Sequence, residues 1–539
     1  MLSFDSPAYF PLLIKTLLRT PLQNAPDTEI VSDGLMRYRY RDFEGRLKRL
    51  GGALASLGIG QGDVVAVMDW DTHRYYECFF AVPMLGAVLH TVNIRLAPAQ
   101  IAYTIDHAED DVILVHLDFL SLMEEVMPMV KRDVQLILLR DDPKQEPESS
   151  FDFITSYDAM MTSSKDDFIF PDFDERMRAT TFFTTGTTGE PKAVAYSHRQ
   201  LVLHTMGLLA GLGPIETSNR LHCGDVYLPI TPMFHVHAWG FPYAATLLGI
   251  KQIYAGRYTP KKLLRLIAQE GVTFSHCVPT ILQMLLSAPE AADTDLSKLK
   301  ILIGGSALPR GLAEAAMERG INVYTGYGMS ETCPVLTISA LDPKDEASVE
   351  PRLKTGNPIP LVDLQTVDAN MVEMPRDGVT TGEVVARAPW LNAEYVRSSD
   401  ATLKLWEGNY LHTGDVGHID AAGTLMITDR MKDVIKSGGE WVSSLELESL
   451  ASAVEGVAEV AAISITDEKW GERPLLLIVT KDGADQITIT EGISAAAQKA
   501  VAAGNLSKWA MPNQFQFVAE IAKTSVGKID KKRLREEFA

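Results

Sequence analysis

Cysteine is rare in this chain of 539 residues, which has four. Cys78, Cys223, Cys277 and Cys333 lie far apart, and no two of them form a CxxC pair. A disulfide framework or a cysteine-rich zinc site needs recurring, closely spaced cysteines, so the sequence indicates neither. A reducing compartment is therefore expected, and we predict a cytoplasmic protein.

Long hydrophobic runs are also missing. The longest uncharged apolar stretch covers residues 78–92, and a helix needs about 18 or more apolar residues to span a bilayer. We expect this stretch to be a buried helix and expect no stable membrane insertion. The N-terminus has no charged segment followed by an apolar one, so no secretory signal is indicated.

Positive charge is in deficit. Lysine and arginine together number 50 against 70 aspartates and glutamates, which leaves a formal net charge of −20. A nucleic-acid-binding surface needs clustered basic residues, so this balance argues against a nucleic-acid partner. The sequence also has no low-complexity tract and no repeat of fixed period. Its length exceeds what one hydrophobic core supports, so two or more domains are expected.

Short apolar runs alternate with helical patterns over most of the chain. Residues 64–68, 112–115, 134–139 and 299–303 are typical of strands buried on both faces, and residues 47–57 and 263–270 have helical spacing. This alternation predicts an α/β fold with largely parallel strands.

The pattern changes near residue 380. Residues 382–386, 411–419 and 424–428 predict a smaller β-rich subdomain. A capping box that begins at Ser443 predicts a helix start, and strand-like residues 457–465 and 475–479 follow. We therefore predict a large N-terminal domain of layered α/β subdomains plus the β-rich subdomain (1–429), a hinge (430–432) and a small α+β C-terminal domain (433–539).

The strongest local signal is the loop at residues 184–192, which reads TTGTTGEPK after a strand-like run. Glycines let the backbone approach a ligand, and free amides with threonine hydroxyls can hold phosphate oxygens. The loop differs from the common GxxxxGK[ST] signature because Ala193 follows Lys192. Its candidate phosphate contacts are Thr184, Thr185, Gly186, Thr187 and Thr188.

This loop resembles the phosphate-binding signature of the adenylate-forming superfamily, which includes acyl-CoA synthetases, luciferases and peptide-synthetase adenylation domains. Five more segments up to about residue 535 resemble the same family. The resemblance implies ATP and coenzyme A as co-substrates and Mg²⁺ beside the phosphates.

The segment YTGYGMSET at residues 324–332 resembles the family's adenine-binding segment. The resemblance implies that Tyr327 holds adenine and that Glu331, with Thr184, helps to bind Mg²⁺, a cation that prefers oxygen ligands. The further nucleotide contacts that it implies are Gly305, Ser306, Ala307, Gly326, Gly328, Met329, Thr332 and Ile427.

The segment LHTGD at residues 411–415 is followed fifteen residues after its aspartate by Arg430. Asp415 resembles the family's ribose-binding aspartate, and Arg430 resembles the arginine that contacts the same ribose. Both belong to the expected nucleotide site.

The segment from Arg430 to Trp441 resembles the family hinge, about which the small domain rotates between two half-reactions. Lys432 is the expected hinge residue, and Lys436 is similar to a lysine that reaches the acyl-adenylate. Gly438 and Gly439 match a glycine pair that lies along the family's pantetheine channel, and Glu440 and Trp441 are further expected acyl or coenzyme A contacts. Near the C-terminus, Lys528 matches a lysine that enters the site during adenylation, where a fixed charge would stabilise the transition state.

The segment PMFHVHAWG at residues 232–240 resembles part of the family's acyl pocket. The resemblance implies that His235 closes on the substrate carboxylate, and His237 replaces a common asparagine. Trp239 resembles the tryptophan that gates the acyl tunnel in fatty-acid-activating members, and it could either gate a long tunnel or close a short pocket. Further expected pocket residues are Val278, Gly304, Cys333 and Pro334. None carries a formal charge with histidine neutral, so the acid is expected to be apolar beyond its carboxylate.

Together these features predict an AMP-forming acyl-CoA synthetase that activates a short- or medium-chain fatty acid or a similar acid, with Lys528, His235, Glu331 and Thr184 as catalytic residues. Ligases for methylmercaptopropionate or for cyclic or aromatic acids stay open, as does a carrier-protein-loading enzyme. The sequence also leaves open a luciferase-like oxygenase and an inactive nucleotide-binding protein. It does not fix the chain length of the acid, and a homodimer stays open.

Overall fold

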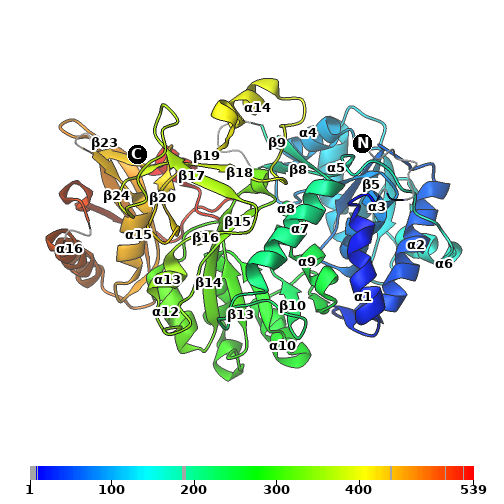
Figure 1. Ribbon diagram of the computed structural model, residues 1–539, viewed down its shortest axis with the longest axis horizontal. Helices are drawn as coiled ribbons and strands as arrows, with labels where there is room; N and C mark the ends of the chain where they lie inside the picture. Colours follow the sequence, from blue (N-terminus) through cyan, green and yellow to red (C-terminus); the bar gives the residue numbers. More distant parts are fainter. Residues whose placement is uncertain (1–7, 9, 185–189, 438–439, 504–505, 526) are drawn as a thin grey trace.

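The computed structural model describes residues 8, 10–184, 190–437, 440–503, 506–525 and 527–539, and it describes only the backbone of residues 440 and 441. Within these ranges the chain forms four sheets, of seven, nine, four and five strands. Figure 1 shows an elongated arrangement, with the N-terminal helices at the right and the C-terminal part at the left. The predicted fold class is confirmed.

The seven-stranded sheet has a parallel interior and one antiparallel edge pair. In spatial order its strands are β7 (Phe153–Ser156), β6 (Gln135–Leu139), β5 (Val112–His116), β3 (Val64–Met68), β4 (Val88–Thr91), β8 (Arg178–Thr184) and β9 (Lys192–Ser197). All residues of β3, β4 and β5 are buried. Helices packed on both faces of parallel strands explain why these runs are apolar throughout.

The nine-stranded sheet is also parallel inside and antiparallel at both edges. In spatial order it contains β16 (Asn357–Pro358), β15 (Val335–Ile338), β14 (Asn322–Gly328), β13 (Lys300–Ile303), β12 (Phe274–Cys277), β10 (Val226–Pro229), β11 (Lys251–Tyr254), β1 (Glu29–Ser32) and β2 (Met36–Arg39).

Helices lie between and around these two sheets. Their bounds are α1 (Arg19–Asn24), α2 (Tyr40–Ser56), α3 (His73–Met84), α4 (Pro98–Ala108), α5 (Leu120–Val126), α6 (Tyr157–Ser163), α7 (His198–Leu212), α9 (Phe241–Leu248), α10 (Pro260–Glu270), α11 (Pro279–Leu286), α12 (Arg310–Glu318) and α13 (Glu350–Leu353). One continuous core joins Val65 of β3, Leu201 of α7 and Leu302 of β13. The two sheets therefore form one body around a shared core, and loops from both can meet at their carboxyl edges.

One expectation from the sequence is wrong. Residues 78–92 do not form one buried helix, because α3 ends at Met84 and strand β4 begins at Val88. Gly86, with φ of 92°, lies in the turn between them, a conformation that favours glycine. Helix and strand are both buried on all sides, so the apolar run gave no periodicity that could separate them. Within the described ranges, every helix is too short or too polar to cross a bilayer.

The β-rich part that was predicted near residue 380 is a four-stranded antiparallel sheet. Its strands are β17 (Asp363–Val367), β18 (Gly382–Arg387), β19 (Leu411–Ile419) and β20 (Leu425–Arg430), with α14 (Ser399–Leu405) beside them. Strand β20 ends at the residue where the predicted hinge begins.

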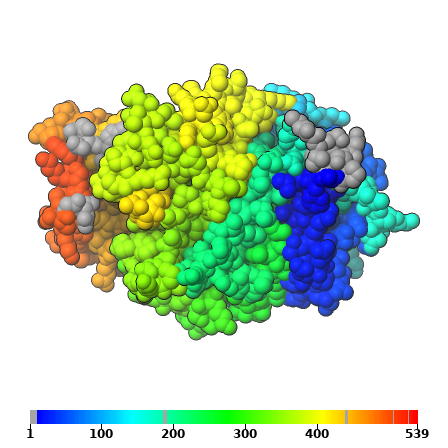
Figure 2. All heavy atoms as spheres, in the orientation of Figure 1, coloured from blue at the N-terminus to red at the C-terminus, as the bar shows by residue number. Residues whose placement is uncertain are grey.

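The C-terminal unit, defined here as residues 433–539, has its own five-stranded sheet. It contains β21 (Ile435–Ser437), β22 (Glu440–Val442), β23 (Val457–Asp467), β24 (Gly471–Thr480) and β25 (Gln514–Phe517), with α15 (Ser444–Ser452), α16 (Gln486–Ala502) and α17 (Lys531–Phe538). The predicted cap is present, since the Ser443 hydroxyl accepts a hydrogen bond from the Glu446 amide. In Figure 2 this orange-to-red unit forms the left end of the molecule.

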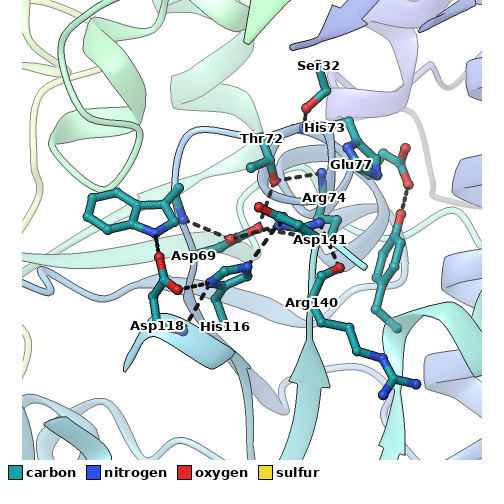
Figure 3. A network of polar contacts seen from close by, with 12 residues as sticks. Ser32, Asp69, Thr72, His73, Arg74, Glu77, His116, Asp118, Arg140 and Asp141 are labelled. Atoms are coloured by element: carbon teal, nitrogen blue, oxygen red, sulfur yellow. Dashed lines mark hydrogen bonds and ion pairs between the residues drawn. The ribbon is translucent and has the colours of Figure 1, made fainter. Parts of the chain in front are cut away.

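Buried Arg74, together with His116, joins the carboxyl ends of three neighbouring strands (Figure 3). Arg74 is 3% exposed and donates to both carboxylate oxygens of Asp69, after β3, and to Asp141, after β6. His116, at the end of β5, lies 3.3 Å from Asp141 and, with Arg74, holds the pKa of that carboxyl well below its usual range. The carboxyl edge from which the site is built is thus internally crosslinked.

Candidate active site

A cavity of about 550 Å³ lies at the carboxyl edges of the two large sheets and extends to the C-terminal unit. Its wall includes most of the predicted site residues whose side chains are described. These are Thr184, His235, Trp239, Gly304, Gly305, Gly326, Tyr327, Gly328, Met329, Glu331, Pro334, Arg430, Lys432 and Lys528. Segments that are up to several hundred residues apart in the sequence therefore meet at one place, as the motifs predicted.

Asp415, Tyr327 and Arg430 form one cluster beside the cavity. The Tyr327 hydroxyl donates to Asp415 Oδ2 at 2.7 Å, and Arg430 Nε lies 3.2 Å from Asp415 Oδ1. Asp415 is buried, whereas Arg430 keeps 46% of its side chain exposed. Water screens an exposed ion pair, so this pair contributes little to folding and leaves the arginine accessible to a ligand.

Glu331 is a buried carboxylate with one short contact. Tyr395 donates its hydroxyl to Glu331 Oε1 at 2.5 Å, and Lys192 lies over the Tyr395 ring with Nζ 4.8 Å from the centroid. Burial raises the pKa of Glu331, while the hydrogen bond from Tyr395 and the charge of Lys192 act in the opposite direction. The carboxylate is thus fixed at the cavity wall with acceptor capacity left for a ligand.

Lys528 reaches the cavity from the C-terminal unit. A Cβ atom added to Gly305, whose φ is 79°, would lie 2.9 Å from Lys528 Cε, so a side chain at residue 305 would obstruct this lysine. Burial and the nearby Arg430 lower the pKa of Lys528 to about 8, while Asp415 and Glu331 partly oppose the shift. The structure therefore has Lys528 beside both acidic residues of the site.

Residues 236–239 form a left-handed turn at the cavity wall. The φ values of Val236, His237, Ala238 and Trp239 are 47°, 54°, 47° and 59°. Each left-handed residue with a side chain costs roughly 1–2 kcal/mol, so surrounding contacts must hold the turn. Immediately before it, the Met233 amide donates to buried Asp71 at 2.9 Å, and burial raises the pKa of Asp71 to about 7.

His237 is buried within a cage of aromatic rings. Its ring centroid lies 5.2 Å from that of Phe182 and 5.7 Å from that of Phe79. Burial lowers the pKa of His237 to about 3, and neither ring nitrogen has a hydrogen-bond partner among the described atoms. His237 is thus a neutral core residue that anchors the left-handed turn.

The lining of the cavity is rich in positive charge. It has eight basic residues, Lys192, Arg397, Arg430, Lys432, Lys528, Lys531, Lys532 and Arg535, against three acidic ones, Glu190, Glu331 and Asp433. The chain as a whole has a net charge of −20, so this local excess is a separate feature. A cavity lining with an excess of positive charge attracts a polyanion such as a nucleoside triphosphate.

Comparison with known proteins identifies the family. Residues 18–396 match the AMP-binding enzyme family, and residues 446–528 match the AMP-binding enzyme C-terminal domain. The chain belongs to this family. The two matches cover the large sheets, most of the cavity wall and most of the C-terminal unit, and they confirm the family that the motifs predicted.

Several relatives match this AMP-binding enzyme along nearly their whole length. A long-chain-fatty-acid–CoA ligase of Thermus thermophilus is 38% identical, over 93% of this chain and 90% of the relative. A medium-chain-fatty-acid–CoA ligase of Ectopseudomonas oleovorans is 35% identical, over 94% of this chain and 92% of the relative. A 3-methylmercaptopropionyl-CoA ligase of Ruegeria lacuscaerulensis is 34% identical, over 98% of this chain and 97% of the relative.

Solved structures support the fold. The anthranilate CoA ligase AuaEII in complex with anthranoyl-AMP has a TM-score of 0.85 at 21% identity, covering 99% of this chain and 98% of its own. ATP-bound MatB from Rhodopseudomonas palustris has a TM-score of 0.82 at 22% identity, covering 98% and 99%. At this identity the likeness concerns the fold alone.

Some predicted residues lie beside the cavity of the enzyme and not on its wall. Asp415 reaches the wall through Tyr327 and Arg430, and Val278 packs beside Gly305. Thr332 and Cys333 are buried, Ser306 and Ala307 are exposed next to Gly305, and Ile427 lies on β20.

Other predicted residues are not brought to the cavity or are not described. Lys436 is exposed on β21, where its amide donates to Glu472 at 2.7 Å, and its role stays a prediction. Thr185, Gly186, Thr187, Thr188, Gly438 and Gly439 lie outside the described residues, as do the side chains of Glu440 and Trp441.

Sequence reasoning missed two side chains at the site. Tyr395 holds Glu331, and Lys192 lies over the Tyr395 ring. Lys192 ends the loop motif and could have been chosen from it, whereas Tyr395 stands outside all six motifs. Only the folded chain brings it to Glu331, 64 residues away.

The pH dependence of the enzyme provides a test of Lys528. If its ammonium form assists ATP chemistry, kcat/KM for ATP is expected to fall as the pH rises through about 8, because the pKa of Lys528 is lowered to about 8. His235 does not contribute in this range, because burial and Lys528 lower its pKa to about 3. Acid-dependent pyrophosphate exchange from about pH 6 to about pH 10 measures the profile.

A Lys528→Arg variant serves as the control. Arginine stays protonated over this range, so the basic limb should disappear even if the rate is lower. A wild-type profile that is flat to about pH 9.5 would contradict the assignment.

Proposed function

We propose that this enzyme is an AMP-forming acyl-CoA ligase that activates a short carboxylic acid, apolar beyond its carboxylate. The observation that carries the proposal is the meeting of Lys528 from the C-terminal unit with Tyr327 and Glu331 at one cavity, with Asp415 hydrogen-bonded to Tyr327 beside it. A cation beside a site for a nucleotide is what carboxylate–phosphate chemistry requires, because charge develops on the phosphate oxygens in the transition state.

In this proposal, ATP lies along the cavity wall. Asp415 and Arg430 bind the ribose, because Asp415 is a buried acceptor and Arg430 stays accessible beside it. Tyr327 packs on adenine, and the basic residues of the cavity lining bind the phosphates. Thr184 begins the phosphate contacts at the end of β8.

Mg²⁺ fits this site only as a partner of the phosphates. The described residues contain no cluster of three or more His, Cys, Asp or Glu side chains that could hold a metal alone. Glu331 keeps acceptor capacity at the wall, and Thr184 offers a hydroxyl, so these two would hold a hard cation together with ATP and water. When bound, the ion would neutralise phosphate charge.

The first half-reaction joins the acid to AMP. A carboxylate oxygen attacks the α-phosphorus of ATP, the bond from that phosphorus to the bridging oxygen breaks, and pyrophosphate leaves. Lys528 stabilises the charge on the α-phosphate, and the half-buried His235 borders the carboxylate. Most of the acceleration comes from positioning and fixed charge.

The second half-reaction transfers the acyl group to coenzyme A. We take residues 433–539 as a mobile domain that turns about a hinge at residues 430–432 and withdraws Lys528. The thiolate sulfur of coenzyme A then attacks the acyl carbon, the bond to the AMP oxygen breaks, and AMP leaves. The change of sheet between β20 and β21 supports a hinge at this position. The cytoplasmic location and the oligomeric state stay predictions from the sequence alone.

The proposed size of the acid follows from what stands behind Trp239. The Trp239 ring lies 5.1 Å from the His276 ring, which stacks on Phe241 at 4.8 Å and receives a 2.7 Å contact from the Tyr227 hydroxyl. Trp239 also lies beside Gly304, where an added Cβ atom would be 3.0 Å from the Trp239 ring. A wall of rings therefore closes the acyl end, which favours a short acid. 3-Methylmercaptopropionate, named for the Ruegeria relative, has this size and polarity.

Replacing Trp239 with alanine is expected to lengthen the acid that is preferred. The ratio of kcat/KM for octanoate over butanoate should rise by about ten-fold or more, because removing an indole opens space for several methylenes. A Trp406→Ala variant is the control, since Trp406 lies outside the cavity and donates to the Asn392 carbonyl. An unchanged ratio in Trp239→Ala would contradict the closed pocket.

The function itself is tested by AMP formation from Mg²⁺-ATP, with and without coenzyme A. The panel of acids runs from acetate to palmitate and includes 3-methylmercaptopropionate, benzoate and cyclohexanecarboxylate. Turnover that depends on coenzyme A and is highest for a short acid is the expected result. AMP formation that ignores coenzyme A would favour a carrier-protein acceptor, and no AMP with any acid would contradict the proposal.

A further inference from the structure

The turn that carries Lys528 is held together by its own hydrogen bonds. The Thr524 amide donates to the Lys528 carbonyl at 2.7 Å, and the Gly527 amide donates to the Thr524 carbonyl at 2.9 Å. The Lys528 amide donates to the Thr524 hydroxyl at 3.2 Å. These contacts are all local, so the turn can keep its shape whether or not it touches the rest of the enzyme.

Three residues from outside the C-terminal unit donate hydrogen bonds to this turn. Asn93 Nδ2 donates to the Ser525 hydroxyl at 3.1 Å, and Arg95 Nη1 donates to the Ser525 carbonyl at 3.2 Å. The Thr280 hydroxyl donates to the Gly527 carbonyl at 3.0 Å. These bonds are made at Ser525 and at Gly527, the residue directly before Lys528, so together they fix where the lysine enters the cavity.

The three residues that donate these hydrogen bonds follow strands of both large sheets. Asn93 and Arg95 follow β4 of the seven-stranded sheet, and Thr280 lies in α11, which follows β12 of the nine-stranded sheet. Asn93 is itself held, because its Oδ1 accepts a hydrogen bond from the Arg95 amide at 3.0 Å. The turn therefore lies in the crevice between the sheets.

Arg95 also links the turn to the segment that carries His235. Its guanidinium lies over the Phe234 ring, 5.7 Å from the centroid, and the Phe234 carbonyl accepts a hydrogen bond from Thr91 at 3.0 Å. None of Asn93, Arg95 and Thr280 lines the cavity. They can therefore affect chemistry through the groups that they hold and, for Arg95, also through its charge near His235.

We propose that Asn93, Arg95 and Thr280 form a dock, called here the lysine dock, that positions Lys528 and favours the domain arrangement of the first half-reaction. They are positioning residues. The assignment to the first half-reaction rests on the proposed function, whereas docking of the C-terminal unit does not.

The dock is weak enough to release the turn in each turnover. One hydrogen bond between neutral groups, or one exposed hydrogen bond to a charged group, changes the equilibrium between the docked and the undocked C-terminal unit by about five-fold. Three such bonds together change it by about a hundred-fold. Arg95 is exposed and Thr280 half-buried, so water can replace these bonds when the C-terminal unit moves away. A buried ion pair at the same place would resist release.

The first arm of the test separates the half-reactions in Thr280→Val and Arg95→Met. Both changes keep much of the side-chain shape and remove the hydrogen bond. Each is expected to lower acid-dependent pyrophosphate exchange by about five-fold, and the double variant by about twenty-fold, with coenzyme A acylation from supplied acyl-AMP changed less than about two-fold. Equal losses in both half-reactions, or unchanged exchange, would overturn the proposal.

Arg257→Met is the matched control. The Arg257 guanidinium lies over the Trp70 ring, 5.5 Å from the centroid, as that of Arg95 lies over Phe234. Arg257 forms an ion pair with Asp118, which follows β5. Its exchange rate should stay near that of the wild type. A fall as large as that of Arg95→Met would mean that loss of a surface arginine, and not loss of the dock, explains the effect.

The second arm measures domain position without any substrate. Energy transfer is recorded between dyes on Cys223, the exposed cysteine, and on an Ile487→Cys variant in exposed α16. In the variant with both Thr280→Val and Arg95→Met, the fraction of molecules that show the dye-to-dye distance of the docked state should be lower than in the wild type. An unchanged distribution would overturn the proposal. If the wild type activates no acid, the proposed function fails, while this second arm still decides whether the dock holds the C-terminal unit.

Discussion

Adenylation by a Lys528→Ala variant is expected to be about 10²–10³-fold slower than in the wild type, the cost of removing one preorganised donor from a developing oxyanion. Lys528 lies beside Gly305 at the cavity and close to Asp415 and Glu331. No other described lysine of the C-terminal unit has this position, and water cannot replace a fixed charge without reorganising. Acid-dependent pyrophosphate exchange measures the loss.

The same variant should acylate coenzyme A from supplied acyl-AMP at nearly the normal rate, because Lys528 is withdrawn in that step. Lys523→Ala is the matched control, since Lys523 lies five residues away and pairs with Glu459 at 2.8 Å on the surface. It should leave both half-reactions within about two-fold, as surface ion pairs contribute little. Equal losses in the two half-reactions of Lys528→Ala would remove this lysine from the mechanism.

An Asp415→Ala variant is expected to lose about 10²-fold or more in kcat/KM for ATP. A carboxylate that binds two hydroxyl groups contributes about 1.5–3 kcal/mol per hydrogen bond. Unlike Lys528→Ala, this change should also slow acylation from acyl-AMP, because the ribose of the AMP moiety is present in both steps. Exchange kinetics over a range of ATP concentrations, together with AMP binding by calorimetry, provide the measurements.

Tyr327→Phe is the control for Asp415. It removes the 2.7 Å hydrogen bond to the carboxylate but keeps the ring, so a loss of about ten-fold or less is expected. Arg430 is 46% exposed and can be hydrated when Asp415 is absent, so the variant should still fold. A normal KM for ATP in folded Asp415→Ala would contradict the assignment of the ribose site.

Sequence reasoning succeeded where local pattern and chemistry coincide. The buried strand β3 was predicted over its full range, because a run of Val and Met between polar residues reflects burial on both faces. Lys528 and Asp415 were predicted because each stands in a segment that resembles a motif of the family, and the structure has Lys528 at the cavity and Asp415 beside it. Where burial was uniform, as between α3 and β4, the pattern had no information about helix or strand, and the prediction failed.

The lysine dock and the left-handed turn could not be found in the same way. Asn93 and Ser525 are 432 residues apart, and a single asparagine and a single serine have no pattern. The four consecutive left-handed residues at 236–239 include β-branched Val236, which would be placed elsewhere by any propensity. Tertiary contacts impose both features, so only the folded chain reveals them.

The left-handed turn sets two evolutionary pressures against each other at one of its four residues. Glycine at Ala238 would relieve about 1–2 kcal/mol of conformational energy for the loss of one methyl group, whereas at Val236 the loss of a buried side chain would offset that relief. The change at Ala238 would also loosen the backbone that orients Trp239, the residue that closes the acyl end. Selection for heat resistance and selection for discrimination between acids would therefore act in opposite directions on Ala238.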